Sequence, residues 1–547
     1  MKPYILSILL VAASLTANGQ QPIQSKDSTL TRTVVVEREY TPEILDAQKV
    51  NVVPQVMPPS ANHPSVEYDQ QLHPACSVPA SVMPPYVAPQ PLSNGWPGYL
   101  HLGLGNLSQW DAQAAYRFAP SERDALSLNF YARGDKTNFK LSGEDTPWNS
   151  GHLNGGFNAL YTHRSEHSEF SARSDLGMSK FDLLPLSDLD KQQFTTGNLT
   201  FGLRSTTDAQ QLLHYDARTS FTYHGRKELV LSSEKDLSEM TLGLDGHVWT
   251  QLKESQWIDL GITLNQYLYN GDDALKNQTT LTLCPSFRYE TESWKIRLGL
   301  KSDLAFGFGK QWQAAPDVEA VYTTGSHVLY ARATGGRLAN DFDRIGQLAP
   351  YAQLPFEQAD ATYEQLNVSA GWKGSPLPGF WIHLYGGYQQ LRNDLIAIRD
   401  NIDGGTGYPW YQSTEFTKNH NLYGGTALRY SYRELFGLRL SALYRNWTLD
   451  EWEQVAFKPE LELEGTLDFR PLKGLQFTAG YRHTTLSSDT YEALSDLYLQ
   501  SSYTLSQVWS GLGVFFEAHN LLDKEYEFTP CVPALGLRLI GGVSLRF

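Results

Sequence analysis

The chain ends in the stretch Ala534 to Phe547, which reads Ala-Leu-Gly-Leu-Arg-Leu-Ile-Gly-Gly-Val-Ser-Leu-Arg-Phe. Its odd-numbered positions, from Leu535 to Phe547, are almost all apolar, whereas the even-numbered positions carry small residues, Ile540 and two arginines. Alternation with a period of two predicts a β-strand with one apolar face and one polar face. A soluble β-sandwich could end in the same way, so the choice of fold depends on how often the pattern recurs upstream.

The same alternation recurs through most of the chain after Trp96. Each segment is about ten residues long, which is the length of a tilted strand that crosses the hydrocarbon layer of a membrane. Clear examples are residues 126–131, 198–204, 242–249, 258–265, 281–289, 294–301 and 461–469. Aromatic residues cluster near segment ends, at Trp381, Tyr385, Tyr388, Tyr430, Tyr432, Tyr444 and Trp447. Such positions are typical of the aromatic girdles of a membrane barrel.

These features predict an all-β fold in which residues 96–547 form a transmembrane antiparallel β-barrel. We expect about 22 strands, within a range of roughly 16 to 22, and an even number if both ends lie in the periplasm. The sheet should close on itself because lipid offers no hydrogen-bond partner to a free edge. Short turns are expected on the periplasmic side, at 323–326, 374–379, 433–437 and 470–474. Long loops are expected outside, at 134–151, 337–361, 390–419 and 525–533.

Composition excludes several other classes of protein. The chain has 547 residues and a formal net charge of −15, which argues against binding to nucleic acid, because that needs a basic surface. The mean hydropathy is −0.38, but a barrel hides only every second residue in lipid, so this value does not exclude a membrane protein. Cys76, Cys284 and Cys531 are widely spaced and form no CxxC pair, so neither a metal site nor a disulfide framework is predicted. A bridge from Cys76 to one of the other two stays open.

The amino-terminal region divides into two parts. Residues 1–19 have the pattern of a secretory signal peptide, with Lys2, an apolar stretch from Ile5 to Leu15 and a small-residue cleavage site at Ala17-Asn18-Gly19. Residues 20–95 are rich in proline, which predicts an extended or disordered periplasmic segment. The chain is therefore expected to leave the cytoplasm.

One island of β-branched residues interrupts this proline-rich segment. It is Thr33-Val34-Val35-Val36-Glu37, within the stretch from Thr31 to Pro42. Such a segment could pair with the sheet edge of a partner protein. The alternative is that it is only the most adhesive part of an unfolded tail.

Several short motifs resemble a known family. Ala518-His519-Asn520-Leu521-Leu522-Asp523-Lys524-Glu525-Tyr526 is similar to the Asn-Leu-Phe-Asp-Lys-x-Tyr segment before the last strand of TonB-dependent outer-membrane receptors. The turn from Arg470 to Leu475 resembles their periplasmic turns. Thr33 to Glu37 is similar to the box that pairs with TonB, and Phe547 resembles the terminal residue read by the barrel-assembly machinery. The resemblance implies a β-barrel in the bacterial outer membrane, surrounded by its lipids.

The chain departs from this family at one point. Such receptors carry a folded plug domain before the barrel, and residues 20–95 lack the composition to fold as one. The resemblance therefore implies a receptor-type barrel without a folded plug, which transports a solute or docks a partner across the outer membrane. The alternative function is a structural or assembly barrel whose lumen or tail holds a periplasmic or surface partner. Candidate partners are a separate plug, a lipoprotein, another periplasmic protein and TonB.

No motif for catalysis, metal binding or cofactor binding is present. The sequence contains no HExxH, no phosphate-binding P-loop and no EF-hand loop. The histidines are scattered, and His247, His383 and His519 are candidates for the lumen wall. We therefore predict a protein that is not an enzyme and needs no cofactor.

Overall fold

The computed structural model describes residues 96–140, 147–182, 191–206, 212–230, 233–350, 352, 358, 360–401, 410–454, 456–505 and 508–547. The expected signal peptide, the proline-rich segment with Thr33 to Glu37, and Cys76 all lie outside these residues. The described part forms a closed sheet of 22 antiparallel strands, which confirms the predicted fold. None of the helical segments in these ranges is long and apolar enough to cross a membrane.

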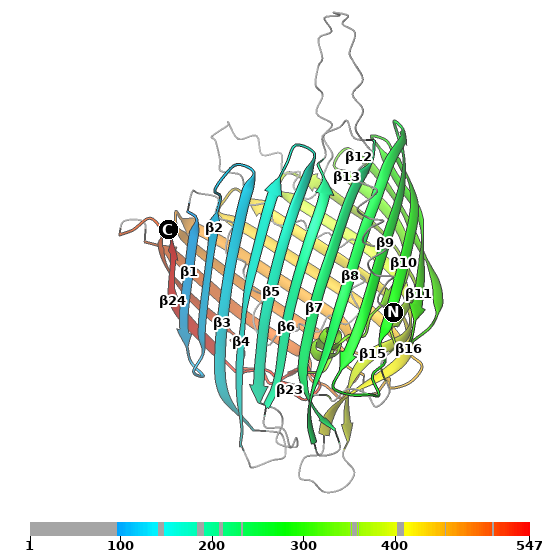
Figure 1. Ribbon diagram of the computed structural model, residues 1–547. Helices are drawn as coiled ribbons and strands as arrows, with labels where there is room; N and C mark the ends of the chain where they lie inside the picture. The colour runs from blue at the N-terminus through cyan, green and yellow to red at the C-terminus, as the bar shows by residue number, and fades with distance from the viewer. Residues whose placement is uncertain are drawn as a thin grey trace, which may run out of the picture. The chain divides into compact units, whose positions relative to one another are not determined.

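The strands follow one another around the barrel in chain order (Figure 1). Their bounds are β1 (Gly98–Gly105), β2 (Trp110–Phe118), β3 (Asp124–Lys140), β4 (Pro147–Arg164), β5 (Ser168–Asp182), β6 (Lys191–Ser205), β7 (His214–Val230), β8 (Ser233–Lys253), β9 (Gln256–Asn270), β10 (Gln278–Glu290), β11 (Trp294–Phe306), β12 (Trp312–Thr324), β13 (His327–Leu338), β14 (Thr362–Leu377), β15 (Phe380–Asn401), β16 (Trp410–Tyr432), β17 (Phe436–Leu449), β18 (Pro459–Leu472), β19 (Leu475–Leu486), β20 (Leu494–Thr504), β21 (Leu512–His519) and β24 (Arg538–Arg546). Helix α2 (Phe342–Leu348) and the hairpin of β22 (Glu527–Thr529) and β23 (Val532–Pro533) lie in connections.

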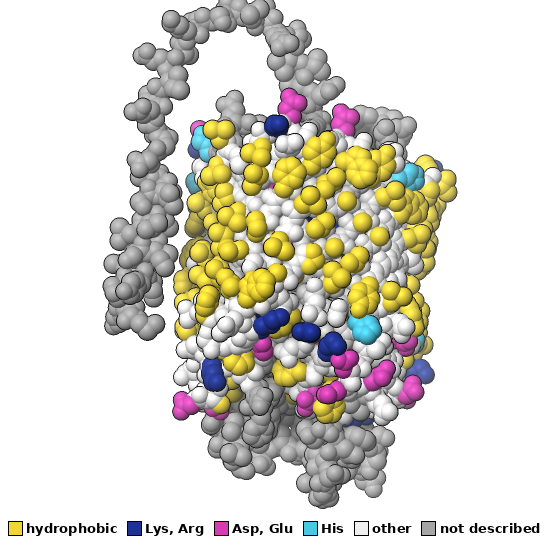
Figure 2. Space-filling model, turned by 90° about the vertical axis from the view of Figure 1, so that its right-hand side faces the viewer, with side chains coloured by type: hydrophobic (Ala, Val, Ile, Leu, Met, Phe, Trp, Pro, Cys, Tyr) yellow, Lys and Arg dark blue, Asp and Glu magenta, His cyan; other side chains and the backbone are white. Residues whose placement is uncertain are grey.

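The last strand closes the barrel as its alternation predicts. β24 pairs with β1, so that Leu102 lies opposite Val543. These two outward side chains are 44% and 46% exposed, whereas the inward Ile540 is 7% exposed. Figure 2 shows, on the face toward the viewer, a broad belt of apolar side chains on the outer surface. A closed barrel with such a belt is an outer-membrane protein.

The connections differ in length at the two ends of the barrel. The end that carries Gly98 and Phe547 has turns as short as residues 325–326 and 378–379. The opposite end carries the connections 339–361 and 520–537. By the usual rule for such barrels, the first end faces the periplasm and the second faces outward.

Two of the expected long loops are wrong. β3 continues to Lys140, and β4 begins at Pro147. Likewise, β15 continues to Asn401, and β16 begins at Trp410. These hairpins lengthen the sheet at the outer end, where no lipid requires an apolar face and the alternation in the sequence fades. The expected loop at 337–361 is confirmed as the connection 339–361, and 525–533 contains the small hairpin β22–β23.

Candidate functional site

Several connections at the outer end of the barrel pack against one another and against the inner wall. We call the described residues of 339–361, 450–458, 487–493 and 520–537 the lid. Figure 1 shows helix α2, from the first of these connections, inside the outline of the barrel. The lid is the part of the described chain that lies across the lumen and could control access to it.

Helix α2 is anchored to the barrel wall at both ends. Asp341 caps the helix by accepting a hydrogen bond from the N–H of Arg344 at 2.9 Å. The N–H of Phe342 donates to the Glu239 carboxylate on β8 at 3.0 Å. After the helix, the Arg226 guanidinium on β7 donates to the carbonyl of Ala352 at 2.8 Å. Desolvation by burial raises the pKa of the Asp341 carboxyl.

An apolar cluster holds the lid together. Its buried members come from three lid connections and from β15 and the end of β19. They are Ile345, Leu348, Ala349, Ala352, Leu395, Ala397, Phe457, Leu486 and Tyr491. Burying one large apolar side chain contributes about 1.5–3 kcal/mol, so the cluster gives these connections a small core of their own. The lid is therefore a packed element.

A buried ion pair joins the lid to the wall. The Lys458 ammonium donates to the Asp394 carboxylate on β15 at 2.5 Å, and both residues are 1% exposed. Asp394 also accepts from the Asn419 amide on β16 at 2.7 Å and from the Arg344 guanidinium of α2 at 3.4 Å. One carboxylate thus ties two lid connections to two strands.

The last connection crosses to the same part of the wall. The Gln412 amide on β16 donates to the Thr529 hydroxyl and to the carbonyl of Pro530, both at 2.7 Å. Arg399 on β15 forms an ion pair with Glu527. The connection from 520 to 537 is therefore fixed to strands far from its own position in the sheet.

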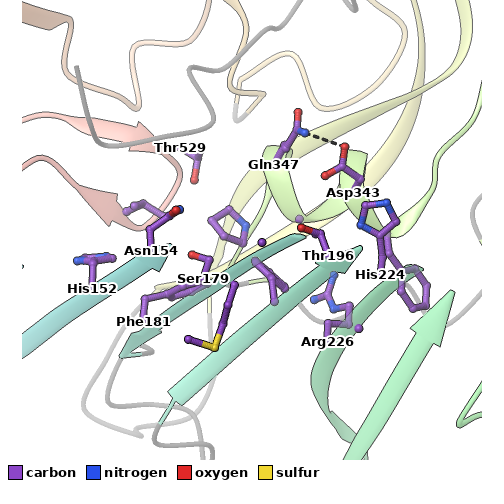
Figure 3. Close-up of a pocket in the computed structure, with 18 of the residues that line it drawn as sticks. His152, Asn154, Ser179, Phe181, Thr196, His224, Arg226, Asp343, Gln347 and Thr529 are labelled. Atoms are coloured by element: carbon purple, nitrogen blue, oxygen red, sulfur yellow. Dashed lines mark hydrogen bonds between the residues drawn. The ribbon is translucent and has the colours of Figure 1, made fainter. Parts of the chain in front are cut away.

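A cavity of about 270 Å³ lies between the lid and the inner faces of β3 to β7. Phe181, Phe194 and Phe342 contribute apolar surface, and His152 and Thr196 contribute polar groups. Figure 3 shows His224 and Arg226 from β7 and the hydrogen bond from Gln347 to Asp343 at 2.8 Å on α2. Apolar walls with a few converging polar groups are typical of sites for small ligands.

The structure places the sequence candidates as follows. Phe547 lies at the seam between β1 and β24, where its N–H and C=O bond to Gly98. Each of the three candidate histidines lies near a polar group: His247 is 3.3 Å from Asp259, His383 is 2.8 Å from the Tyr330 hydroxyl, and His519 is 3.6 Å from Glu517. Cys284 and Cys531 form no disulfide with any described residue, and the open bridge to Cys76 lies outside the described ranges. In the described ranges, no group of three His, Cys, Asp or Glu residues is placed to hold a metal ion.

Sequence reasoning predicted the long connection at 337–361 but missed its helix, the packing of the lid and the cavity. One local signal was present, because Asn340-Asp341 before an apolar Phe342 is a helix N-cap pattern. The pairing of Asp394 with Lys458 had no such signal, since 64 positions separate the two residues.

Comparisons with known proteins show what this fold is similar to. No family model matches the chain, and no curated protein matches it. The FrpB iron transporter from Neisseria meningitidis (F3-3 variant) superposes with a TM-score of 0.65 at 10% identity, over 83% of this chain and 81% of that chain. The FpvAI–pyocin S2 complex gives 0.60 at 11% identity, over 83% and 73%. A mutant of the ferric enterobactin receptor PfeA from Pseudomonas aeruginosa gives 0.61 at 11% identity, over 82% and 80%.

These neighbours are TonB-dependent receptors with barrels of 22 strands. The resemblance stated from the motifs is therefore confirmed at the level of the fold. At sequence identities near 10%, the similarity supports only a shared fold. The activity of this chain has to be argued from its own residues.

Proposed function

We propose that this protein is a receptor-type barrel that binds a solute at the outer end of its lumen and passes it to the periplasm. The observation that carries the proposal is the lid, which packs at the outer end of the lumen and borders a cavity against β3 to β7. A mouth that is closed by packed connections, and not by the wall itself, can open without any break in the sheet. In this proposal the chain works without a folded plug in residues 20–95.

The names of the structural neighbours support the same class of function. They describe an iron transporter and a ferric enterobactin receptor, and we carry over only uptake of a solute. Neighbours that are transporters and receptors also support a role that is not enzymatic.

Ion conductance of the full-length protein in planar bilayers tests the proposal. We expect the wild type to pass little current and the variant D394A to open in large steps of nanosiemens scale, because the Lys458 ammonium is left buried without its carboxylate. The matched control is K418A/D450A, which removes an ion pair that is about half exposed, with N–O distance 3.1 Å. This control should behave like the wild type.

Two outcomes would contradict the proposal. A wild type that conducts as a wide pore would show that the lid does not close the mouth. Silence of both variants, together with a protein that co-purifies from membranes, would favour the structural or assembly barrel instead.

A further inference from the structure

Three cationic side chains gather on the outer surface of the barrel, at the outer edge of the apolar belt and away from the cavity. They are Lys310 in the turn between β11 and β12, Arg337 on β13 and Arg392 on β15, and we call them the basic cluster. Tyr363 on β14 lies between the two arginines, because each of them is its directly opposite residue on a neighbouring strand. Neighbouring strands are roughly 4.8 Å apart, so the two arginine backbones are about 10 Å apart.

The register of the sheet places these arginines on the outward face. On β15, Arg392 is eight positions from Leu384, an exposed apolar residue of the belt, and side chains an even number of positions apart share a face. Arg337 and Tyr363 face the same way as Arg392, since directly opposite residues lie on one side of a sheet. The cluster therefore faces the membrane and not the lumen.

The cluster also lies at the height where hydrocarbon gives way to headgroups. Ile382 follows the periplasmic turn 378–379 by three residues, and Arg392 lies ten residues further along β15. At roughly 3.3 Å per residue and a tilt near 40°, ten residues span about 25 Å, which is the height of the apolar band of such barrels. Lys310 comes two residues before Trp312, an exposed ring of the kind that marks the membrane interface. Figure 2 shows Lys and Arg side chains along the lower edge of the apolar belt.

One carboxylate accompanies the three cations. Among the described residues, this acid is Asp360, which lies 3.7 Å from the Arg337 guanidinium and accepts a hydrogen bond from the backbone N–H of Lys310 at 3.1 Å. The Tyr363 hydroxyl donates to the same carboxylate at 3.2 Å. Arg392 is exposed and has no ion pair within the described ranges. Three positive charges against one negative charge leave an excess of two.

The next strand provides a comparison. Lys418 on β16 is also exposed near the outer end, but its ammonium lies 3.1 Å from the Asp450 carboxylate, and both side chains are about half exposed. This pair is neutral, so β16 adds no net charge to the basic cluster. Arg392 is exposed on the adjacent strand without such a partner in the described part of the chain.

Neutral contacts hold the cluster in place. The Lys310 ammonium and the Arg337 guanidinium lie 5.5 and 5.7 Å from the ring centre of Tyr363, and Lys310 also donates to the Gln313 amide oxygen at 3.3 Å. A ring face attracts a cation without neutralising its charge. The side chain of Arg337 is only 7% exposed, so Lys310 and Arg392 are the groups that can contact a headgroup, while Arg337 adds its charge from behind.

We propose that the basic cluster binds the phosphorylated headgroup of a lipid in the outer leaflet. The acyl chains of this lipid pack on the apolar belt, and its phosphate groups lie level with Lys310 and Arg392. Clusters of lysine and arginine at headgroup level attract anionic lipids, and arginine binds phosphate through two parallel hydrogen bonds. The inference goes beyond the proposed transport, because it concerns the outer surface and not the lumen.

Native mass spectrometry of the full-length protein, released from detergent micelles, tests this inference. The probes are diphosphorylated lipid A, the same lipid after removal of its phosphates, and inorganic pyrophosphate, which has no acyl chains. The variant K310Q/R392Q removes the two exposed cations of the cluster. The matched control R433Q/K473Q removes two exposed cations from turns at the periplasmic end, where Arg433 also lies on a ring, 5.4 Å from the centre of Tyr432. K310R/R392K keeps the charge and shows whether loss of binding reflects misfolding.

We expect the wild type to bind the diphosphorylated lipid about tenfold or more tightly than the dephosphorylated lipid. K310Q/R392Q should lose this preference, and the control and K310R/R392K should retain it. Equal binding of the two lipids, equal loss in R433Q/K473Q, or a loss in K310R/R392K as large as in K310Q/R392Q would overturn the inference. Pyrophosphate that displaces the lipid at equal concentration would assign the cluster to a soluble phosphate and would overturn it as well.

Discussion

Phe547 and Gly98 close the barrel through a reciprocal pair of backbone hydrogen bonds. The N–H of Gly98 donates to the carbonyl of Phe547 at 2.8 Å, and the N–H of Phe547 donates to the carbonyl of Gly98 at 3.0 Å. The terminal residue therefore has a structural position at the seam, beside the role in assembly that the resemblance implies. The two roles can be separated by experiment.

We predict that F547A lowers the amount of folded protein in the outer membrane severalfold and leaves refolding into detergent nearly unchanged. The backbone pair with Gly98 survives this substitution, whereas a signal read from the side chain is lost. Heat modifiability on gels measures the folded fraction in both cases. F118A is the matched control, because it removes an exposed ring at the end of β2, in the strand next to β1. Equal losses in cells and in detergent would mean that the ring of Phe547 acts through stability alone.

The barrel could be predicted from the sequence because the membrane imposes a rule on every strand. Inside lipid, the outer face of a strand must be apolar. The alternation of apolar and polar residues therefore indicates that side chains such as Leu102 and Val543 face outward. Beyond the lipid this rule ends. Leu395, Ile396, Ala397 and Ile398 on β15 are all buried, because the outer extension of the strand is covered on both faces. Four consecutive buried residues give no period of two, and the stretch was expected to be a loop.

The lid could not be predicted for a different reason. Its contacts join residues that are remote in sequence, such as Arg399 and Glu527, which are 128 positions apart. A single sequence contains no signal for such a pair.

The segment from Thr33 to Glu37 remains a prediction, because it lies outside the described residues. If it pairs with TonB or with another periplasmic protein, its deletion should abolish co-purification of that partner from membranes while the barrel still folds. A deletion of Ser60 to Pro64, which has the same length and lies in the same proline-rich segment, is the control. Partner binding that survives the first deletion would assign the segment no role in docking.

The buried ion pair in the lid should show strong asymmetry between single and double substitutions. D394A leaves the Lys458 ammonium buried without its carboxylate and should destabilise the docked lid by about 3–5 kcal/mol. D394A/K458M removes both charges and should cost clearly less. Hydrogen exchange of the α2 amides reports the opening of the lid directly, with K418A/D450A as the exposed-pair control. Equal protection in D394A and the wild type would show that the pair does not hold the lid.

The docking of α2 should also depend on pH. The pKa of Asp341 is raised above its usual value because burial desolvates the carboxyl and Asp343 lies near, although Arg344 and His224 act in the opposite direction. An acid with a raised pKa binds its proton more tightly in the docked state than in the open state. The docked lid therefore loses stability as pH rises from the ordinary range of an aspartic acid through the raised pKa.

D341N tests this dependence, because asparagine keeps the acceptor that caps α2 and removes the titrating group. We expect the pH dependence of α2 exchange protection, corrected for the intrinsic exchange rate, to weaken in D341N and to persist in D343N. Glu239 accepts from the N–H of Phe342, so the companion variant E239Q measures what that carboxyl contributes to the same transition. A pH profile that D341N leaves unchanged would remove Asp341 from the mechanism that holds the lid closed.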